Sequence, residues 1–318
     1  MSTGLPFLDA DAIRTAVPIG DLVDAVEDAY RDVAAGRDRS PIRSHVALDD
    51  GALLLMPGVR VGAAGATVKI VTVMPRNAEQ GLATVQALVT WIDASTGTPR
   101  ALLDGATVTA MRTGAASGVA TRLLAREDAT TLAIIGAGAQ AEWQVRAVLA
   151  VRRIERVLVF ARSPLGRERF AERLSGSSGI ETLAVDTAEA AVRQADVVCC
   201  ATTSAEPVFD AAWLRPGTHV NGIGAFTLDM VELPPELFAI AAPVAVDSRA
   251  AAMTEAGDVV AAIRRGLVSE AALVEIGTVE RSWAASRDPE AVTAFKSVGL
   301  AIQDVAAAEL IVDRLLRT

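Results

Sequence analysis

The 318-residue chain is predicted to be an α/β protein, in which a doubly wound parallel sheet is inserted into a second, α+β domain. Three observations predict this. Short apolar strands alternate with helices from residue 131 to residue 247, as in βαβ units. A glycine-rich turn of the form G-x-G-x-x-A follows the first of these strands. The preceding region has the pattern of an antiparallel sheet after a helical start, and the chain is long enough for two domains.

The composition excludes several classes of protein. Hydrophobic residues make up 51% of the chain and charged residues 22%, which excludes disordered, collagen-like and disulfide-stapled chains. A net charge of −9 disfavours non-specific binding of nucleic acid, which needs clustered positive charge. No apolar run is long enough for a membrane span, and the N-terminus lacks the pattern of a signal peptide. We therefore expect a cytoplasmic protein that binds neither nucleic acid nor membrane.

Cys199 and Cys200 are neighbours in an apolar run. They are expected to be buried thiols rather than parts of a disulfide or a metal site, which agrees with a reducing compartment. The chain has only two histidines, so a histidine-rich metal centre is not expected, and we predict no metal.

The first third of the chain changes its hydrophobic period. Residues 9–36 are predicted to be helical, with Leu22, Val23, Val26 and Tyr30 on one face. Strands are then expected at residues 52–56, 66–73, 84–92 and 100–103, with a turn at Pro57-Gly58, and a helix over 107–125.

The alternating region follows. Strands are predicted at residues 131–136, 157–161, 197–202, 219–223 and 244–247, and helices at 140–150 and 167–174. A last helix, at about 298–316, has no place in a nucleotide-binding fold. We expect it to return to the first domain and pack there.

The turn at Gly136 has the chemistry of a dinucleotide site. Gly136 permits the tight turn, Gly138 lets the backbone approach a pyrophosphate, and the small Ala141 lets helix and strand pack closely. The N-terminus of the following helix favours the phosphate charge. The alternative is a glycine-rich turn without a ligand.

The next strand ends at Ala161-Arg162-Ser163, where NAD enzymes usually place a carboxylate that binds the ribose 2′-hydroxyl. Here Arg162 can pair with a 2′-phosphate and Ser163 can donate to it. NADP(H) is therefore the preferred cofactor, with NAD(H) as the alternative if Arg162 is merely a surface residue.

Three basic residues in apolar or turn settings indicate a substrate site. Arg43, Lys69 and Arg112 lie outside the nucleotide-binding region, and Lys69 is one of only two lysines in a chain whose other basic residues are arginines. Lys69 lies in a strand, where a charge must be paired or face a site. Arg112 is expected at the start of a helix, where an anion is favoured. Together they predict a pocket for a small carboxylate; the alternative is that each is a structural ion-pair partner.

Several motifs, in order along nearly the whole chain, resemble those of the ornithine cyclodeaminase/mu-crystallin family. They are Gly81–Gln86 (GLATVQ), Asp93–Gly97 (DASTG), Leu102–Gly105 (LLDG), Thr109–Ser117 (TAMRTGAAS), Ile135–Ala141 (IGAGAQA), Asn221–Ala225 (NGIGA), Val246–Ser248 (VDS), Ala256–Asp258 (AGD) and Phe295–Gly299 (FKSVG).

The resemblance implies a homodimer that exchanges hydride between a nicotinamide and a small amino acid or cyclic imine. It implies a substrate-binding and dimerisation domain at 1–117 plus 297–318, and a Rossmann-type NAD(P)-binding domain at 118–296. It assigns the substrate carboxylate to Arg43, Lys69 and Arg112, and a substrate-pocket position to Thr84. The positions that match cofactor contacts are Thr113, Ala137, Gly138, Ala139, Gln140, Thr202 and Ser297.

One departure from the family pattern favours a particular activity. Ornithine cyclodeaminases carry an aspartate at the position of Phe226, as a partner for the terminal amine of the substrate, and an aromatic ring cannot accept that hydrogen bond. Asp229, three positions later, need not face the pocket. Ala83 and Ala87 replace a common proline and glycine and affect only the loop.

The pattern is closer to ketimine reductases and pyrroline-2-carboxylate reductases. We therefore predict a reductase of pyrroline-2-carboxylate or piperideine-2-carboxylate in which Lys69 is catalytic and keeps the imine nitrogen protonated. The alternatives are ornithine cyclodeaminase, an amino-acid dehydrogenase and a non-catalytic NADP(H)-binding protein.

Overall fold

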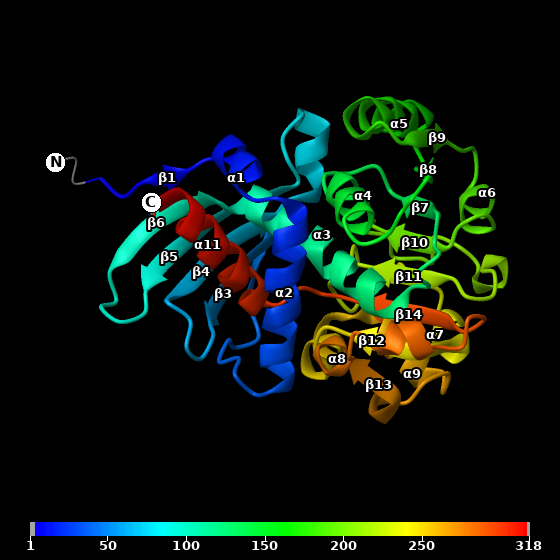
Figure 1. Cartoon of the computed structure of the whole chain (residues 1–318). Coiled ribbons are helices and arrows are strands. Elements are labelled where there is room, and N and C mark those ends of the chain that lie inside the picture. Colours follow the sequence, from blue (N-terminus) through cyan, green and yellow to red (C-terminus); the bar gives the residue numbers. More distant parts are fainter. Residues whose placement is uncertain (1–3, 317–318) are drawn as a thin grey trace. The chain divides into compact units, whose positions relative to one another are not determined.

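The computed structural model describes residues 4–316, which form two compact units (Figure 1). Unit 1 extends to Arg112 and resumes at Leu300, and unit 2 is Thr113–Gly299. The first boundary falls inside helix α3 (Gly105–Leu124). The α/β class with an inserted parallel sheet is confirmed. The functional domains at 1–117 plus 297–318 and at 118–296 stay a prediction, and residues 1–3 and 317–318 lie outside the described part.

Unit 1 contains a six-stranded sheet in the order β1-β6-β5-β4-β3-β2. Strands β2 to β6 pair antiparallel, as the sequence predicts, and β1 pairs parallel with β6. The strands are β1 (Phe7–Leu8), β2 (Ser44–Leu48), β3 (Gly51–Val59), β4 (Gly65–Val73), β5 (Val85–Asp93) and β6 (Pro99–Asp104), with a short 3-10 helix at Pro75–Gln80. The last helix, α11 (Ala301–Leu316), packs on β3, β4 and β5, so its predicted return is confirmed (Figure 1).

The predicted helix over residues 9–36 is two helices, α1 (Ala10–Ala16) and α2 (Ile19–Ala34). The break lies at Val17-Pro18. Val17 is extended, with φ −118° and ψ 100°, because a residue before proline is disfavoured in the α conformation. Helix α2 buries the predicted face, including Leu22, Val23, Val26 and Tyr30.

The predicted turn at Pro57-Gly58 is wrong, because both residues continue strand β3. Gly58 serves a packing purpose instead. A Cβ atom at this position would lie 2.6 Å from Cγ2 of Val305 and 2.8 Å from the carbonyl oxygen of Ala301. Only glycine therefore lets α11 approach the sheet this closely.

Unit 2 contains an eight-stranded parallel sheet in the order β13-β12-β14-β11-β10-β7-β8-β9. Its strands are β7 (Thr131–Ile135), β8 (Arg156–Phe160), β9 (Glu181–Ala184), β10 (Val197–Cys200), β11 (His219–Gly222), β12 (Ala241–Val246), β13 (Leu273–Glu275) and β14 (Val292–Lys296). Its helices, apart from its part of α3, are α4 (Ala141–Leu149), α5 (Pro164–Ser178), α6 (Ala188–Val192), α7 (Leu237–Ile240), α8 (Arg249–Glu255), α9 (Gly257–Arg264) and α10 (Trp283–Ser286). The order of strands reverses at β7, where the chain proceeds first to β8 and β9 and then to β10 on the other side.

The core of unit 2 contains both cysteines, which are buried and free, as predicted. Burial raises the pKa of the Cys199 thiol to about 12, so it stays protonated at neutral pH. Among the described residues, no helix is long and apolar enough to cross a bilayer.

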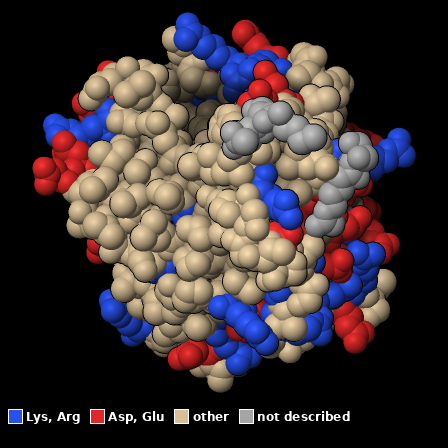
Figure 2. Space-filling view, turned by 90° about the vertical axis from the view of Figure 1, so that its left-hand side faces the viewer, with Lys and Arg blue, Asp and Glu red and all other residues tan. Residues whose placement is uncertain are grey.

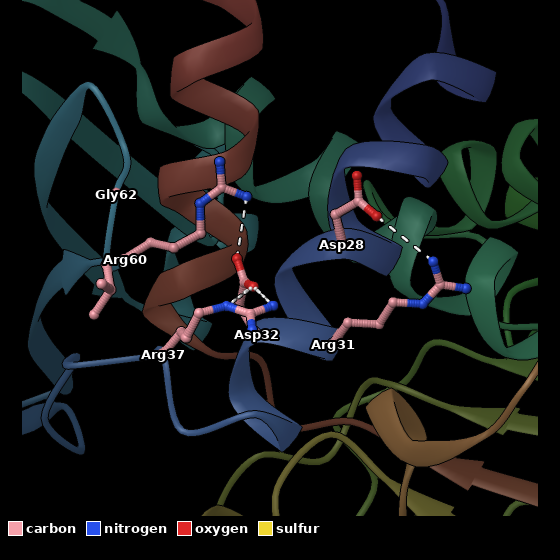
Figure 3. A pocket seen from close by; sticks show the side chains of 7 residues that line it. Asp28, Arg31, Asp32, Arg37, Arg60 and Gly62 are labelled. Carbon is pink, nitrogen blue, oxygen red and sulfur yellow. Dashed lines mark hydrogen bonds and ion pairs between the residues drawn. The ribbon is translucent and has the colours of Figure 1, made fainter.

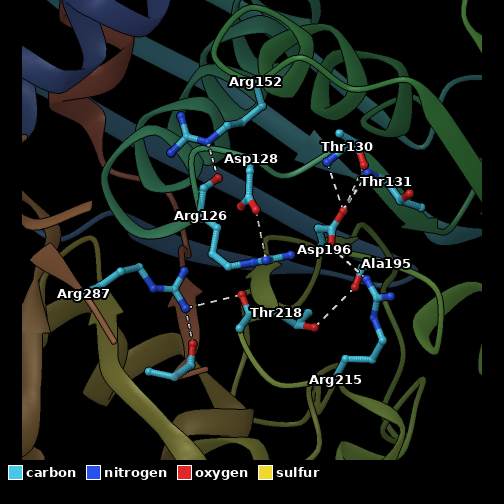
Figure 4. Close-up of polar contacts among 12 residues, drawn as sticks. Arg126, Asp128, Thr130, Thr131, Arg152, Ala195, Asp196, Arg215, Thr218 and Arg287 are labelled. Carbon is cyan, nitrogen blue, oxygen red and sulfur yellow. Dashed lines mark hydrogen bonds and ion pairs between the residues drawn. The ribbon is translucent and has the colours of Figure 1, made fainter. Parts of the chain in front are cut away.

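Buried polar contacts fix the amino ends of the strands in unit 2 (Figure 4). Asp196 accepts hydrogen bonds from the backbone nitrogens of Thr130 and Thr131, both at 3.0 Å, and from Arg126 and Arg215, both at 2.8 Å. The guanidinium of Arg152 donates to carbonyl oxygens at the end of α3, including that of Ala125 at 2.8 Å. A cation at a helix C-terminus is favourable, so this edge of the sheet holds the end of α3 in place.

Candidate functional site

Lys69 is buried in the middle of the sheet of unit 1. It lies in β4, opposite Met56 of β3 and Val89 of β5, and its side chain is 1% exposed. Its ammonium lies 2.7 Å from Oδ2 of Asp304 on α11. Burial, followed by the positive charge of Arg112, lowers the pKa of Lys69 to about 7, although Asp304 opposes this shift. A lysine with a pKa near 7 can both hold and release a proton at neutral pH.

Asp304 joins Lys69 to the second basic residue. Its Oδ1 accepts a hydrogen bond from Nε of Arg112 at 3.1 Å, and Gln303 accepts from the same guanidinium at 3.0 Å. Arg112 occupies the eighth position of α3 and not its start, so the predicted helix-terminus effect on an anion is wrong. Its position near Lys69 results from pairing with α11 instead.

Sequence reasoning missed Asp304 and Gln303. A signal for both was present, since a carboxylate and an amide interrupt the otherwise apolar residues 301–308, and such groups must be paired when buried. Besides accepting from Arg112, Gln303 accepts from the backbone nitrogen of Leu300 at 2.8 Å and donates to the hydroxyl of Tyr30 at 2.5 Å. These contacts hold the first turn of α11 in one orientation beneath the basic residues.

The structure places Arg43 near this pair, while Thr84 lies apart from it. Arg43 is half-buried just before β2, and its charge contributes to the lowered pKa of Lys69. Thr84 lies one residue before β5, five positions from Val89, the residue that faces Lys69. No hydrogen bond within the described residues joins the Thr84 side chain to the basic residues.

A separate cavity of about 340 Å³ in unit 1 is lined mainly by charged side chains (Figure 3). These charges are already paired. Asp32 lies 2.5 Å from Arg37 and 3.4 Å from Arg60, and Arg31 lies 3.8 Å from Asp28. Arg31 and Arg60 also pair with Glu27 at 2.5 Å and Glu309 at 2.7 Å, so each arginine of the cavity already has a carboxylate partner, and we do not assign the cavity to the site. Across residues 4–316, no cluster of metal-binding side chains was found.

The glycine-rich turn of unit 2 fits a dinucleotide. Gly136 has φ +110°, and a Cβ there would lie 2.7 Å from the carbonyl oxygen of Ala201, so glycine is required. At Gly138 a Cβ would meet no atom within 4 Å, which leaves the backbone open to a ligand. Helix α4 begins without a side-chain cap, and the buried Oε1 of Gln140 has no hydrogen-bond partner. Both features suit a helix N-terminus that receives a phosphate.

The other predicted cofactor positions in unit 2 vary in their surroundings. Ala141 is buried at the first position of α4, while Ala137 is half-buried and Ala139 exposed. Thr113 is buried in α3. Thr202 follows β10, and Ser297 follows β14 and donates its hydroxyl hydrogen to Asp247 at 2.9 Å. The carboxyl ends of parallel strands are where dinucleotides bind in such sheets.

At the end of β8, Arg162 is exposed and makes no hydrogen bond or ion pair with any other described residue. Ser163 has a structural task, because it is the N-cap of α5 and accepts a hydrogen bond from the backbone nitrogen of Gly166 at 3.1 Å. Its hydroxyl hydrogen stays available to a second group.

Comparison with known proteins finds relatives that match nearly the whole chain in sequence and in structure. The chain is 37% identical over 313 residues to a Delta(1)-pyrroline-2-carboxylate reductase of Bacillus cereus, covering 97% of this chain and 96% of the relative. A Thermococcus litoralis Delta(1)-pyrroline-2-carboxylate reductase in complex with NADH and L-proline superimposes with a TM-score of 0.93 at 35% identity, covering 98% of both chains. An archaeal alanine dehydrogenase dimer with bound NAD matches with a TM-score of 0.89 at 31% identity, covering 98% of this chain and 96% of that one. The family model of the ornithine cyclodeaminase/mu-crystallin family matches residues 7–318, and the chain belongs to this family.

Proposed function

We propose that the protein is a cytoplasmic, NAD(P)H-dependent reductase of small cyclic imines that carry a carboxylate beside the C=N bond. Pyrroline-2-carboxylate and piperideine-2-carboxylate are the expected substrates. The observation that carries the proposal is the buried cluster of Lys69, Arg112 and Asp304, in which the lysine has a pKa of about 7. The similarity to pyrroline-2-carboxylate reductases supports it.

In the proposed mechanism, Arg43 and Arg112 hold the substrate carboxylate, and Thr84 contributes to the wall of the pocket. Lys69 donates a proton to the imine nitrogen, which makes the adjacent carbon electrophilic. When bound, the reduced nicotinamide supplies the hydride that this carbon accepts, so that the imine becomes a cyclic amino acid. The carboxylate of the substrate adds a negative charge near Lys69 and so favours its protonated form.

Asp304 is assigned a positioning role. It balances one of the two buried cations and fixes the direction of the Lys69 ammonium. Burying both Lys69 and Arg112 as cations without Asp304 would be strongly unfavourable for the folded state.

The proposal is tested by following the oxidation of NADPH and NADH with each of the two imines near neutral pH. We expect oxidation with both imines and accumulation of the saturated cyclic amino acid. Release of ammonia from ornithine without net formation of NADH would instead identify an ornithine cyclodeaminase. NAD reduction with alanine, without activity on either imine, would identify an amino-acid dehydrogenase, and binding without turnover a non-catalytic protein.

We propose that the cofactor site is formed by Thr113, Gly136, Ala137, Gly138, Ala139, Gln140, Ala141, Arg162, Ser163, Thr202 and Ser297. We further propose a preference for NADPH. It rests on the exposed guanidinium of Arg162 at the end of β8, and on the absence of a carboxylate from Ala161-Arg162-Ser163.

Arg162→Ala is expected to raise the KM for NADPH by about tenfold and to leave the KM for NADH within about twofold, because only the 2′-phosphate pairs with the guanidinium. Arg169→Ala, an exposed arginine of α5, is the control and should change neither value. Equal effects of Arg162→Ala on both cofactors would contradict the proposed preference.

We propose that the protein is a homodimer that uses the open face of the sheet in unit 1. Side chains alternate along a strand, so those that point away from α11 form a second, largely apolar face; they are Leu53, Leu55, Val68, Ile70 and Leu88. Ile70 is 43% exposed. Figure 2 shows a broad area with few charged side chains on the side where β1, β5 and β6 lie in Figure 1. Apolar patches of this kind mark protein interfaces.

Ile70→Glu is expected to convert the dimer into monomers, because a carboxylate would be buried without a partner at the interface. Light scattering gives the mass in solution. Leu165→Glu, which replaces a 54% exposed leucine of α5, is the matched control and should remain dimeric. A monomeric wild-type protein would contradict the dimer, and a dimeric Ile70→Glu variant would contradict the assignment of this face.

A further inference from the structure

The loops at the carboxyl ends of β10 and β11 in unit 2 are joined by a buried carboxylate that the proposed mechanism does not use. Glu232 lies in the segment after β11 and is 0% exposed. One of its oxygens accepts a hydrogen bond from the backbone nitrogen of Thr202 at 2.5 Å, and the other accepts from that of Gly224 at 2.9 Å. A single side chain therefore binds the chain where it leaves two adjacent strands.

The two loops are in direct contact at this point. A Cβ atom on Gly224 would lie 2.0 Å from the carbonyl oxygen of Thr202 and 2.7 Å from the carboxylate of Glu232. No other residue type fits there without displacing backbone atoms. The distance between the loops is thus set by a glycine on one side and by Glu232 across both.

Lys296, the second lysine of the chain, holds the same loop from β14. Its ammonium donates to the carbonyl oxygen of Ala225 at 2.7 Å and lies 3.2 Å from Asp258 on α9. All three ionisable side chains are fully buried. Burial raises the pKa of Glu232, but the charge of Lys296 and the two backbone hydrogen bonds oppose that shift. The ammonium is thus the counter-charge of the cluster.

The topology indicates which part of a dinucleotide these loops face. The order of strands reverses at β7, and dinucleotides bind across the carboxyl ends at such a point. The turn after β7 suits the pyrophosphate, and the end of β8 is where the adenosine ribose is bound in this kind of sheet. The loops after β10 and β11 lie on the other side of β7, which is the side of the nicotinamide.

We propose that Glu232 is a positioning residue for the nicotinamide half of the cofactor, because it fixes the Thr202 and Gly224 loops against each other. The inference rests on the nicotinamide cofactor of the proposed function and does not depend on which imine is reduced. In this scheme Glu232 touches neither the imine nor Arg43 and Arg112, which hold the substrate carboxylate. It acts through the backbone of the two loops.

The test compares the binding of NADH with that of ADP, which carries only the adenosine half and its phosphates. Glu232→Gln keeps one acceptor but presents an NH2 group to the other backbone N–H. We expect it to weaken NADH binding, measured by fluorescence, by about tenfold. ADP binding, measured by calorimetry, should stay within about twofold of wild type. Glu236→Gln is the matched control, since this exposed carboxylate four positions later pairs with Arg265 and should leave both affinities unchanged.

Equal loss of NADH and ADP binding would overturn the inference, because it would indicate a general structural role. Unchanged binding of both would overturn it as well. If Glu232→Gln does not fold, Glu232→Asp decides the question: it keeps the charge but is shorter by one methylene, so it should lose NADH affinity selectively and by less. A wild-type protein that binds ADP but neither NADH nor NADPH would contradict the proposed function itself, whereas variants that bind like wild type contradict only this inference.

Discussion

Lys69→Met is expected to lower kcat for imine reduction by about 10²- to 10⁴-fold, the usual contribution of a positioned general acid. Methionine has a similar length and suits the apolar neighbours Met56 and Val89, and Asp304 keeps Arg112 as its partner, so the fold should persist. Steady-state kinetics with thermal unfolding as a check of the fold measure the effect. A kcat near that of wild type would remove Lys69 from the mechanism.

The pH dependence gives a second measure of the same residue. Lys69 is protonated below its pKa of about 7, and only that form can donate a proton. We therefore expect kcat/KM to be constant at low pH and to fall tenfold per unit as the pH rises above about 7. Because the substrate carboxylate favours the charged lysine, the corresponding fall in kcat should lie at higher pH. Lys69→Arg is the discriminating variant: it keeps the charge but does not release its proton, so it should remain slow at every pH.

Asp304→Asn is expected to lower the free energy of unfolding by about 3–5 kcal/mol, because it removes the shared partner of two buried cations. It should also lower the pKa of Lys69, since Asp304 is the group that raises it. The fall in kcat/KM should therefore move to lower pH. Denaturant unfolding and pH–rate profiles measure the two effects.

Asp49→Asn replaces an exposed carboxylate between β2 and β3 of the same unit and serves as the control, with stability within about 0.5 kcal/mol of wild type. In the double variant Lys69→Met with Asp304→Asn, one cation has been removed together with the carboxylate. Its loss of stability should be smaller than the sum of the two single losses, which a double-mutant cycle detects. Strict additivity would show that the 2.7 Å contact does not couple these residues.

Hydrophobic periodicity and turn residues predicted the helices and strands that are determined by their own local sequence. The alternation after residue 131 and the glycine-rich turn at Gly136 led to the parallel sheet and its helix α4. Pro57-Gly58 misled, because its glycine serves the approach of α11 rather than a turn, and that helix lies far along the chain. Strand β14 was not predicted, for a similar reason. Its apolar run is short, and its position inside the sheet depends on pairing with β11 and β12, which are distant in sequence.

The candidate site likewise contains residues that the local sequence identified and partners that only the tertiary structure shows. Lys69 and Arg112 could be selected because a charge in an apolar element is unusual, and the structure brings them together. What brings them together is Asp304, which is 192 residues from Arg112. Glu232 likewise acts on Thr202 and Gly224 through backbone hydrogen bonds. No spacing rule connects such partners, since the contacts are made by tertiary structure alone.

Helix α11 has a consequence for the order in which the protein becomes active during synthesis. Unit 2 is a continuous stretch of chain, so all of its residues leave the ribosome before α11 does. Unit 1 cannot complete its fold before α11 has been translated, because this helix packs on its sheet. The usual order, in which the N-terminal domain folds first, is thus reversed: unit 1, which contains the N-terminal part, completes its fold after all of unit 2 has been translated. Since Asp304 lies in α11, Lys69 and Arg112 gain their partner only after this helix has been translated, and a chain truncated before α11 would lack it.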